Sequence, residues 1–128
     1  MTAQHHVTLT IPADGAYLSI LRTATAGLAA RLDFTLDGIE DLRMAVDEAC
    51  ALLLPQSEAR SNLECGFDVG DDSLTIEVTA HSASPKPPRR DGFAWTVLTA
   101  LTTAVDSSVD ESSVTLRLTR DREGHEHP

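Results

Sequence analysis

The segment that decides the fold is residues 63–79, which read LECGFDV, then GDD, then SLTIEVT. Apolar and polar residues alternate through both seven-residue stretches, and a period of two places every second side chain on the same face of a β-strand. The intervening Gly70, Asp71 and Asp72 are typical of a tight turn. The segment therefore predicts a β-hairpin with one apolar and one polar face.

Upstream of the hairpin, the pattern predicts a strand and then two helices. Residues 6–11 (HVTLTI) alternate until Pro12, which ends the strand. After Asp14 and Gly15, apolar residues three and four positions apart predict a helix over residues 16–32. Its buried stripe is expected to contain Tyr17, Ile20, Leu21, Ala24, Leu28 and Leu32.

The second helix is expected to begin after Thr35, whose hydroxyl is suited to capping, with Asp37 in the first turn where a carboxylate suits the helix dipole. Pro55 would stop this helix at about Leu54. Its apolar stripe is expected to consist of Ile39, Leu42, Val46, Ala49 and Leu53.

Downstream of the hairpin, residues 81–91 contain three prolines and predict an exposed loop that carries Lys86, Arg89 and Arg90. Residues 93–105 are rich in helix formers and predict a third helix, with Trp95 packing its start. Residues 113–119 alternate again and predict a last strand that turns Val114, Leu116 and Leu118 inward. From Arg120 onward the sequence is charged and is expected to be a frayed tail.

This order of elements predicts an α/β two-layer sandwich, in which helices cover one face of a mixed, mainly antiparallel sheet. The polar strand faces would leave the other side of the sheet open to water or to contacts. The 128 residues are expected to form a single domain, with a core over about residues 6–120 and a charged tail over residues 121–128.

Composition excludes several classes of partner. Twenty acidic residues against ten basic ones give a net charge of −10, whereas a nucleic-acid surface needs clustered lysine and arginine. A basic protein partner is compatible with this charge. No apolar run approaches the length of a membrane span, and the first residues lack the features of a signal peptide, so a cytoplasmic location is expected.

The cysteines and histidines do not indicate a metal site. Cys50 and Cys65 are interpreted as buried free thiols, with a redox pair or a disulfide as the alternative. His5 and His6 at one end, and His125 and His127 at the other, have no metal-ligand spacing and are expected to lie in solvated tails.

The second helix carries a family resemblance. Residues 41–50 (DLRMAVDEAC) resemble the first conserved box of the anti-sigma factor serine kinases of bacterial stress-response and sporulation switches. These are small members of the histidine-kinase, gyrase and Hsp90 ATPase superfamily. Residues 21–22, residues 91–98 (DGFAWTVL) and residues 113–119 are similar to further family segments in the same order. The resemblance spans about residues 6–120, looks most like the actinobacterial branch, and implies the histidine-kinase-like ATPase fold.

The resemblance also implies where a nucleotide would bind. Glu48 matches the glutamate that orients or deprotonates the reacting hydroxyl, or it remains as a solvated relic of that role. Four residues later, on the same helix face, Leu52 stands in place of the asparagine that holds Mg²⁺. Residues 78–83 (VTAHSA) lack the aspartate and glycines that receive adenine, and the lid is a short proline-rich loop.

The nucleotide elements that remain are weak. Gly92, Ala94 and Thr96 at the start of the third helix, with Thr115 on the last strand, are the residues that match the family's nucleotide contacts. No cofactor is therefore expected, and ATP with Mg²⁺ would bind only if the ancestral site still works. No metal-ligating residue is predicted, and enzyme activity is not expected.

The resemblance implies protein partners. Arg22 matches an arginine through which the family contacts its partners, and Leu18 and Leu21 lie beside it. The function expected is an anti-sigma factor that acts as a homodimer, sequesters an alternative sigma factor and is released by a STAS-type anti-anti-sigma factor. Two alternatives stay open: an active ATP-dependent serine kinase that phosphorylates this antagonist, and a regulatory module with another target.

Overall fold

The alternating segment forms the predicted hairpin, in which β2 (Asn62–Val69) pairs antiparallel with β3 (Ser73–His81). We describe the protein from a computed structural model, in which residues 5–122 are described. The hairpin lies in the middle of a five-stranded sheet of order β1-β2-β3-β5-β4, with β1 at His5–Pro12, β4 at Ala104–Val109 and β5 at Ser113–Asp121. Every pair of neighbouring strands is antiparallel, so the sheet is not mixed.

Strand β4 replaces the end of the predicted third helix. Helix α3 spans Phe93–Leu101, and the chain then turns back as β4, which pairs with β5 at the edge of the sheet. The prediction of a helix to residue 105 was wrong. Residues 104–109 (AVDSSV) contain only two strong strand formers, so their sequence does not indicate a strand. Pairing with β5 forms this strand, and such pairing leaves no local signal in the sequence.

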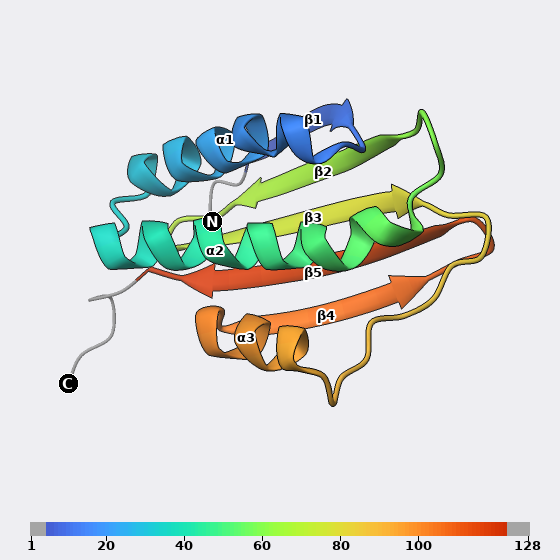
Figure 1. Cartoon of the computed structure of the whole chain (residues 1–128). Helices are drawn as coiled ribbons and strands as arrows, with labels where there is room; N and C mark the ends of the chain where they lie inside the picture. The colour runs from blue at the N-terminus through green and yellow to red at the C-terminus, as the bar shows by residue number, and fades with distance from the viewer. Residues whose placement is uncertain (1–4, 123–128) are drawn as a thin grey trace.

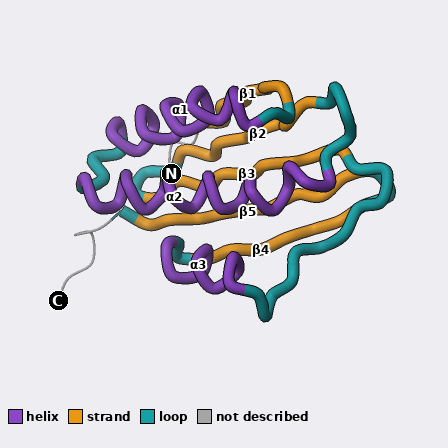
Figure 2. Tube along the Cα trace, viewed as in Figure 1, coloured by secondary structure: helices purple, strands orange, loops and turns teal. Residues whose placement is uncertain are grey.

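Three helices cover one face of the sheet, and α2 (Leu36–Leu53) lies between α1 (Leu18–Arg31) and α3 (Figures 1 and 2). The predicted cap of α2 is confirmed, because the Thr35 hydroxyl accepts a hydrogen bond from the Gly38 backbone N–H at 3.0 Å. The helix ends one residue before Leu54, where a short 3₁₀ turn, η2 (Leu54–Gln56), contains Pro55. A similar turn, η1 (Gly15–Tyr17), precedes α1.

The face that α1 buries differs from the prediction. Leu21, Thr25 and Ala29 are buried, whereas Tyr17 and Ile20 are 43% and 47% exposed. Tyr17 lies in the 3₁₀ turn, outside the regular helix that the periodicity assumed. Thr25 tolerates burial because its hydroxyl donates to the Leu21 carbonyl at 2.8 Å. The rest of the predicted stripe is confirmed, because Leu21 is buried and Ala24, Leu28 and Leu32 pack against the core.

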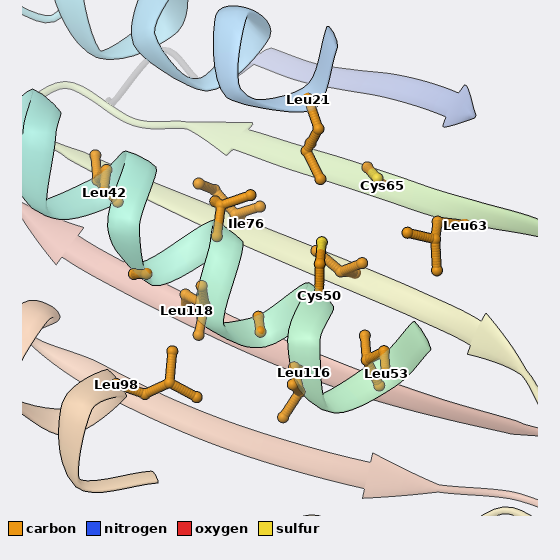
Figure 3. Packing of buried hydrophobic residues seen from close by; sticks show 14 of the residues in the cluster. Leu21, Leu42, Cys50, Leu53, Leu63, Cys65, Ile76, Leu98, Leu116 and Leu118 are labelled. Atoms are coloured by element: carbon orange, nitrogen blue, oxygen red, sulfur yellow. The ribbon is translucent and has the colours of Figure 1, made fainter. Parts of the chain in front are cut away.

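The core lies between the helices and the sheet (Figure 3). The predicted inward residues of the last strand, Val114, Leu116 and Leu118, are fully buried there. The strand continues beyond them, however, and Arg120 belongs to it with its side chain in the core layer. The prediction of a frayed tail from Arg120 was therefore wrong for Arg120 and Asp121. Residues 123–128, with His125 and His127, lie outside the described residues.

The other face of the sheet is polar and uncovered by any described element, as predicted (Figure 1). Cross-strand pairs connect it: Thr75 with Thr119 at 3.1 Å, Thr79 with Thr115 at 2.7 Å, and Glu77 with Arg117. His6 lies on β1, as the alternation of residues 6–11 predicts and contrary to its interpretation as part of a solvated tail, with a ring nitrogen 2.6 Å from Asp68. These polar side chains satisfy one another's hydrogen-bonding groups across neighbouring strands.

Within residues 5–122, no helix is both long and apolar enough to cross a membrane.

Both cysteines are buried free thiols, as the sequence predicts (Figure 3). The pKa of Cys50 is raised from 9.0 to about 12, mainly by burial and to a smaller extent by the neighbouring Cys65 and Asp47. Burial also raises the pKa of Cys65 to about 11. Both groups are thus held neutral in the folded protein, because a low-dielectric core disfavours the thiolate.

The thiols are expected to resist chemical labelling. At pH 8 the native protein should react with a disulfide reagent at least about 100-fold more slowly than the protein unfolded in urea, because the thiolate is the nucleophile. The raised pKa values contribute stability that is complete below about pH 9 and declines as the pH rises further. A thiol that reacts equally fast in folded and unfolded protein would contradict this burial.

Candidate functional site

Glu48 lies on the side of α2 that faces α3. Asp41, two turns earlier on the same side of the helix, accepts a hydrogen bond from Arg120 at 2.8 Å, and Arg120 also donates to the Leu101 carbonyl at the end of α3 at 2.7 Å. Helix α3 runs antiparallel to α2 in Figure 1, so its first residues lie toward the C-terminal half of α2. Glu48 therefore faces the beginning of α3. It is half-buried, and no partner for it is found among the described residues.

Leu52 occupies the next turn of the same side of α2. Its side chain is partly buried and packs against the hydrophobic core. Mg²⁺ requires oxygen ligands, which an aliphatic side chain cannot supply. Within residues 5–122, no group of three or more histidine, cysteine or acidic residues is placed to hold a metal ion.

The end of β3, where the family reads adenine, has no carboxylate directed toward the helices. Ala80 and Ser82 are buried, so the main chain continues close to the core at this point. Thr79 and His81 point to the opposite, open face, where they pair with Thr115 and Glu64. The residues present at the ends of α2 and β3 thus do not fit Mg²⁺ and ATP bound in the family's manner.

The beginning of α3 retains the geometry of an anion site in part. Gly92 is the N-cap residue, and no side chain caps the first turn. The Thr96 hydroxyl donates a hydrogen bond to the Gly92 carbonyl at 3.2 Å, so the hydroxyl points back along the helix. Ala94 is half-buried and Trp95 is buried, in agreement with the predicted packing role of Trp95. Free backbone N–H groups remain here, because a helix leaves its first four unsatisfied.

The structure separates Thr115 from the other predicted nucleotide contacts. Leu116 beside it points into the core, so alternation places Thr115 on the open face of the sheet, bonded to Thr79. Glu48 and Gly92 lie in the helical layer on the other side. Thr115 therefore cannot share a pocket with them. Five of the surface cavities lie over other described elements, and none of these five is lined by Glu48, Leu52 or Gly92.

The three predicted partner contacts on α1 are placed differently from one another. Leu21 is fully buried and faces the core, so it is not available at the surface. Leu18 is partly buried and packs against the same core. Arg22 is one-third exposed and donates to the Asp47 carboxylate of α2 at 2.8 Å. Asp47 precedes Glu48 and was not expected in the site, because the 25 positions that separate the two partners give no sequence signal.

The chain is similar in sequence to curated proteins, although no family model matches it. It is 34% identical over 80 residues to the serine-protein kinase RsbW of Bacillus velezensis, across 60% of this chain and 50% of that protein. It is 31% identical over 104 residues to the anti-sigma-F factor RsbW of Mycobacterium tuberculosis, across 81% of this chain and 62% of that protein. The chain thus spans between half and two thirds of the length of these relatives.

A solved structure shows the same fold. The crystal structure of the RsbU and RsbW domains of Rv1364c from Mycobacterium tuberculosis matches with a TM-score of 0.73 and 14% sequence identity, over 92% of this chain and 32% of that one. By sequence the chain is therefore similar to RsbW serine-protein kinases and anti-sigma factors, and it has the histidine-kinase-like ATPase fold that the sequence predicts.

Proposed function

We propose that the chain is an anti-sigma factor that acts by sequestration and has lost nucleotide chemistry. It would bind an alternative sigma factor and be released when a STAS-type anti-anti-sigma protein competes for an overlapping surface. The observation that carries the proposal is Leu52, a core-packed aliphatic side chain one turn after Glu48, where metal-dependent phosphoryl transfer needs an oxygen ligand. One relative is named a serine-protein kinase and another an anti-sigma-F factor, and these names support the family role.

Without phosphorylation, relative affinity and concentration would decide which partner is bound. A ligand shifts such an equilibrium only by as much as its affinities differ. The net charge of −10 favours a partner with a basic surface, because opposite fields accelerate encounter. We also propose that the chain acts as a homodimer in the cytoplasm, as the family resemblance implies.

The partners are tested by affinity purification of the tagged chain from its native host. Recovery of a sigma factor, displaced by an added STAS-type protein without ATP, is the expected result. Recovery of a sensor kinase or another regulator with no sigma factor would support the alternative of a regulatory module with another target.

Nucleotide binding gives a separate prediction. Titration calorimetry with ATP and Mg²⁺ is expected to give a dissociation constant weaker than about 1 mM, or about −4 kcal/mol of binding free energy. The Glu48→Gln variant serves as a control, since any weak heat from this site should change with it. A low-micromolar dissociation constant would overturn the proposal.

The active kinase is the second candidate, because Glu48 still faces the beginning of α3 and has no described partner. Incubation with labelled ATP and candidate STAS-type proteins separates the two readings. Phosphate transfer that disappears in Glu48→Gln would establish the kinase.

A further inference from the structure

The loop between β3 and α3, residues 82–92, is attached to the rest of the molecule along its length. In the family resemblance this segment corresponds to the lid that closes over ATP. Here it contains Pro85, Pro87 and Pro88, whose rings fix one backbone angle each and reduce the number of conformations open to the chain. The attachments of this loop to its neighbours can be followed from one end to the other.

The first attachment joins the loop to the β4–β5 turn. Ser82 is buried, and its backbone N–H donates to the Ser112 carbonyl at 2.9 Å. The Ser82 hydroxyl accepts a hydrogen bond from the Ser84 N–H at 3.2 Å. The loop therefore leaves the sheet in a defined direction.

The second attachment is made by Gln56 of η2, at the end of α2. Its side-chain amide donates to the Lys86 carbonyl and accepts from the Lys86 N–H, each at 3.0 Å. The side chain thus binds both backbone groups of one residue, as a neighbouring β-strand would. Replacing Gln56 with any residue lacking an amide removes at least one of these bonds.

The third attachment is made by Arg90, close to the start of α3. Its guanidinium lies 4.6 Å from the ring centroid of Trp95, within the range of a cation–π contact. It also donates to the Asp106 carboxylate at 3.1 Å and to the Ser107 hydroxyl at 3.4 Å. A hydrogen bond from the Ser107 N–H, and then the one from Arg90, lower the pKa of Asp106 and keep it charged.

We propose that residues 82–92 form a strap that is fixed in one position without nucleotide, with Gln56 and Arg90 as its positioning residues. The strap connects η2, the β4–β5 hairpin and α3. In a mobile lid ATP would order the segment, whereas here contacts within the protein already order it. It presents a preset surface that includes the 81% exposed side chain of Phe93 at its end. The inference goes beyond the proposed function, because it holds whichever protein the chain binds.

Amide hydrogen exchange of the full chain tests the clamp at Gln56. The Lys86 N–H is expected to exchange about 10- to 100-fold more slowly than an unbonded loop amide, and Gln56→Ala should remove this protection. The Ser82 N–H, bonded to Ser112, is the internal control and should keep its protection in Gln56→Ala. Gln56→Glu should retain part of the protection, since its carboxylate still accepts from Lys86.

Nucleotide independence is tested with the wild-type chain alone, so the proposal stays testable if a variant fails to fold. Adding ATP and Mg²⁺ at millimolar concentration should leave the exchange of the Lys86 N–H unchanged. Two results would overturn the strap: an unprotected Lys86 N–H in the free protein, or protection that appears only with nucleotide. Neither result depends on whether a sigma factor binds.

Fluorescence tests the clamp at Arg90, because Trp95 is the only tryptophan. Arg90→Ala should raise the acrylamide quenching constant of Trp95 about twofold, since the guanidinium that covers the ring is removed. Arg89→Ala is the matched control, because Arg89 pairs with Asp91 within the loop and should leave quenching unchanged. Equal quenching in Arg90→Ala and the wild type would show that Arg90 does not hold the strap to Trp95.

Discussion

Replacing Arg120 with alanine is expected to lower the free energy of unfolding by about 3 kcal/mol, near the lower end of the range for breaking a buried ion pair. The Arg120 side chain is 11% exposed and donates to the Asp41 carboxylate and the Leu101 carbonyl. It therefore connects β5 to the beginning of α2 and the end of α3. The substitution leaves both acceptors without this donor and also removes the packing of the aliphatic stem.

Urea unfolding of Arg120→Ala and of a matched surface variant measures this effect. Arg43 forms an exposed pair with Glu40 within α2 at 3.0 Å, so Arg43→Ala should cost no more than about 0.5 kcal/mol. A double-mutant cycle with Asp41→Ala isolates the coupling between Arg120 and Asp41. A loss in Arg120→Ala no larger than in Arg43→Ala would show that the pair does not stabilise the fold.

Arg120 also shows where reasoning from sequence stops. In the sequence it opens a charged stretch, and its partner Asp41 lies 79 positions earlier. The elements that were predicted well are those with local causes: the alternation of the hairpin, the Thr35 cap and the proline after α2. Strand β4 was missed because only its pairing with β5 makes it a strand. Elements that depend on pairing between distant segments therefore could not be predicted from the local sequence pattern.

The same distinction applies to the candidate site. Glu48 and Leu52 share a helix face, and the helical repeat alone predicts their relation. The sheet face on which Thr115 lies and the burial of Leu21 depend on how strand and helix pack together. Thr115 therefore lies on the opposite side of the sheet from the predicted site, and Leu21 lies in the core. The partners of Arg22, Lys86 and Trp95 come from other segments or from irregular turns. No periodic pattern could indicate them.

Charge reversal at Arg22 is the second large effect, and it rests on the proposed function. If Arg22 contacts the sigma factor, Arg22→Glu should weaken binding at least about 30-fold, because an arginine at a binding hot spot contributes about 2 kcal/mol or more. The structure complicates this variant, since the new carboxylate would lie beside Asp47 and repel it. Loss of binding in Arg22→Glu alone would therefore mix a lost contact with a disturbed joint between α1 and α2.

Asp47→Asn separates the two causes. It removes the charge partner of Arg22 while the arginine stays in place, and the pair is exposed enough that its loss should cost at most about 1 kcal/mol of stability. If Arg22 is a contact residue, Asp47→Asn should change the dissociation constant of the copurified sigma factor less than about threefold, or tighten it by freeing the guanidinium for the partner. If the pair only joins the two helices, both variants should weaken binding together, in proportion to their losses of stability. Calorimetry of the two variants against the same sigma factor, with urea unfolding in parallel, distinguishes these outcomes. Unchanged binding in Arg22→Glu would remove Arg22 from the partner surface and leave the exposed face of α1 around Ile20 as the place to search.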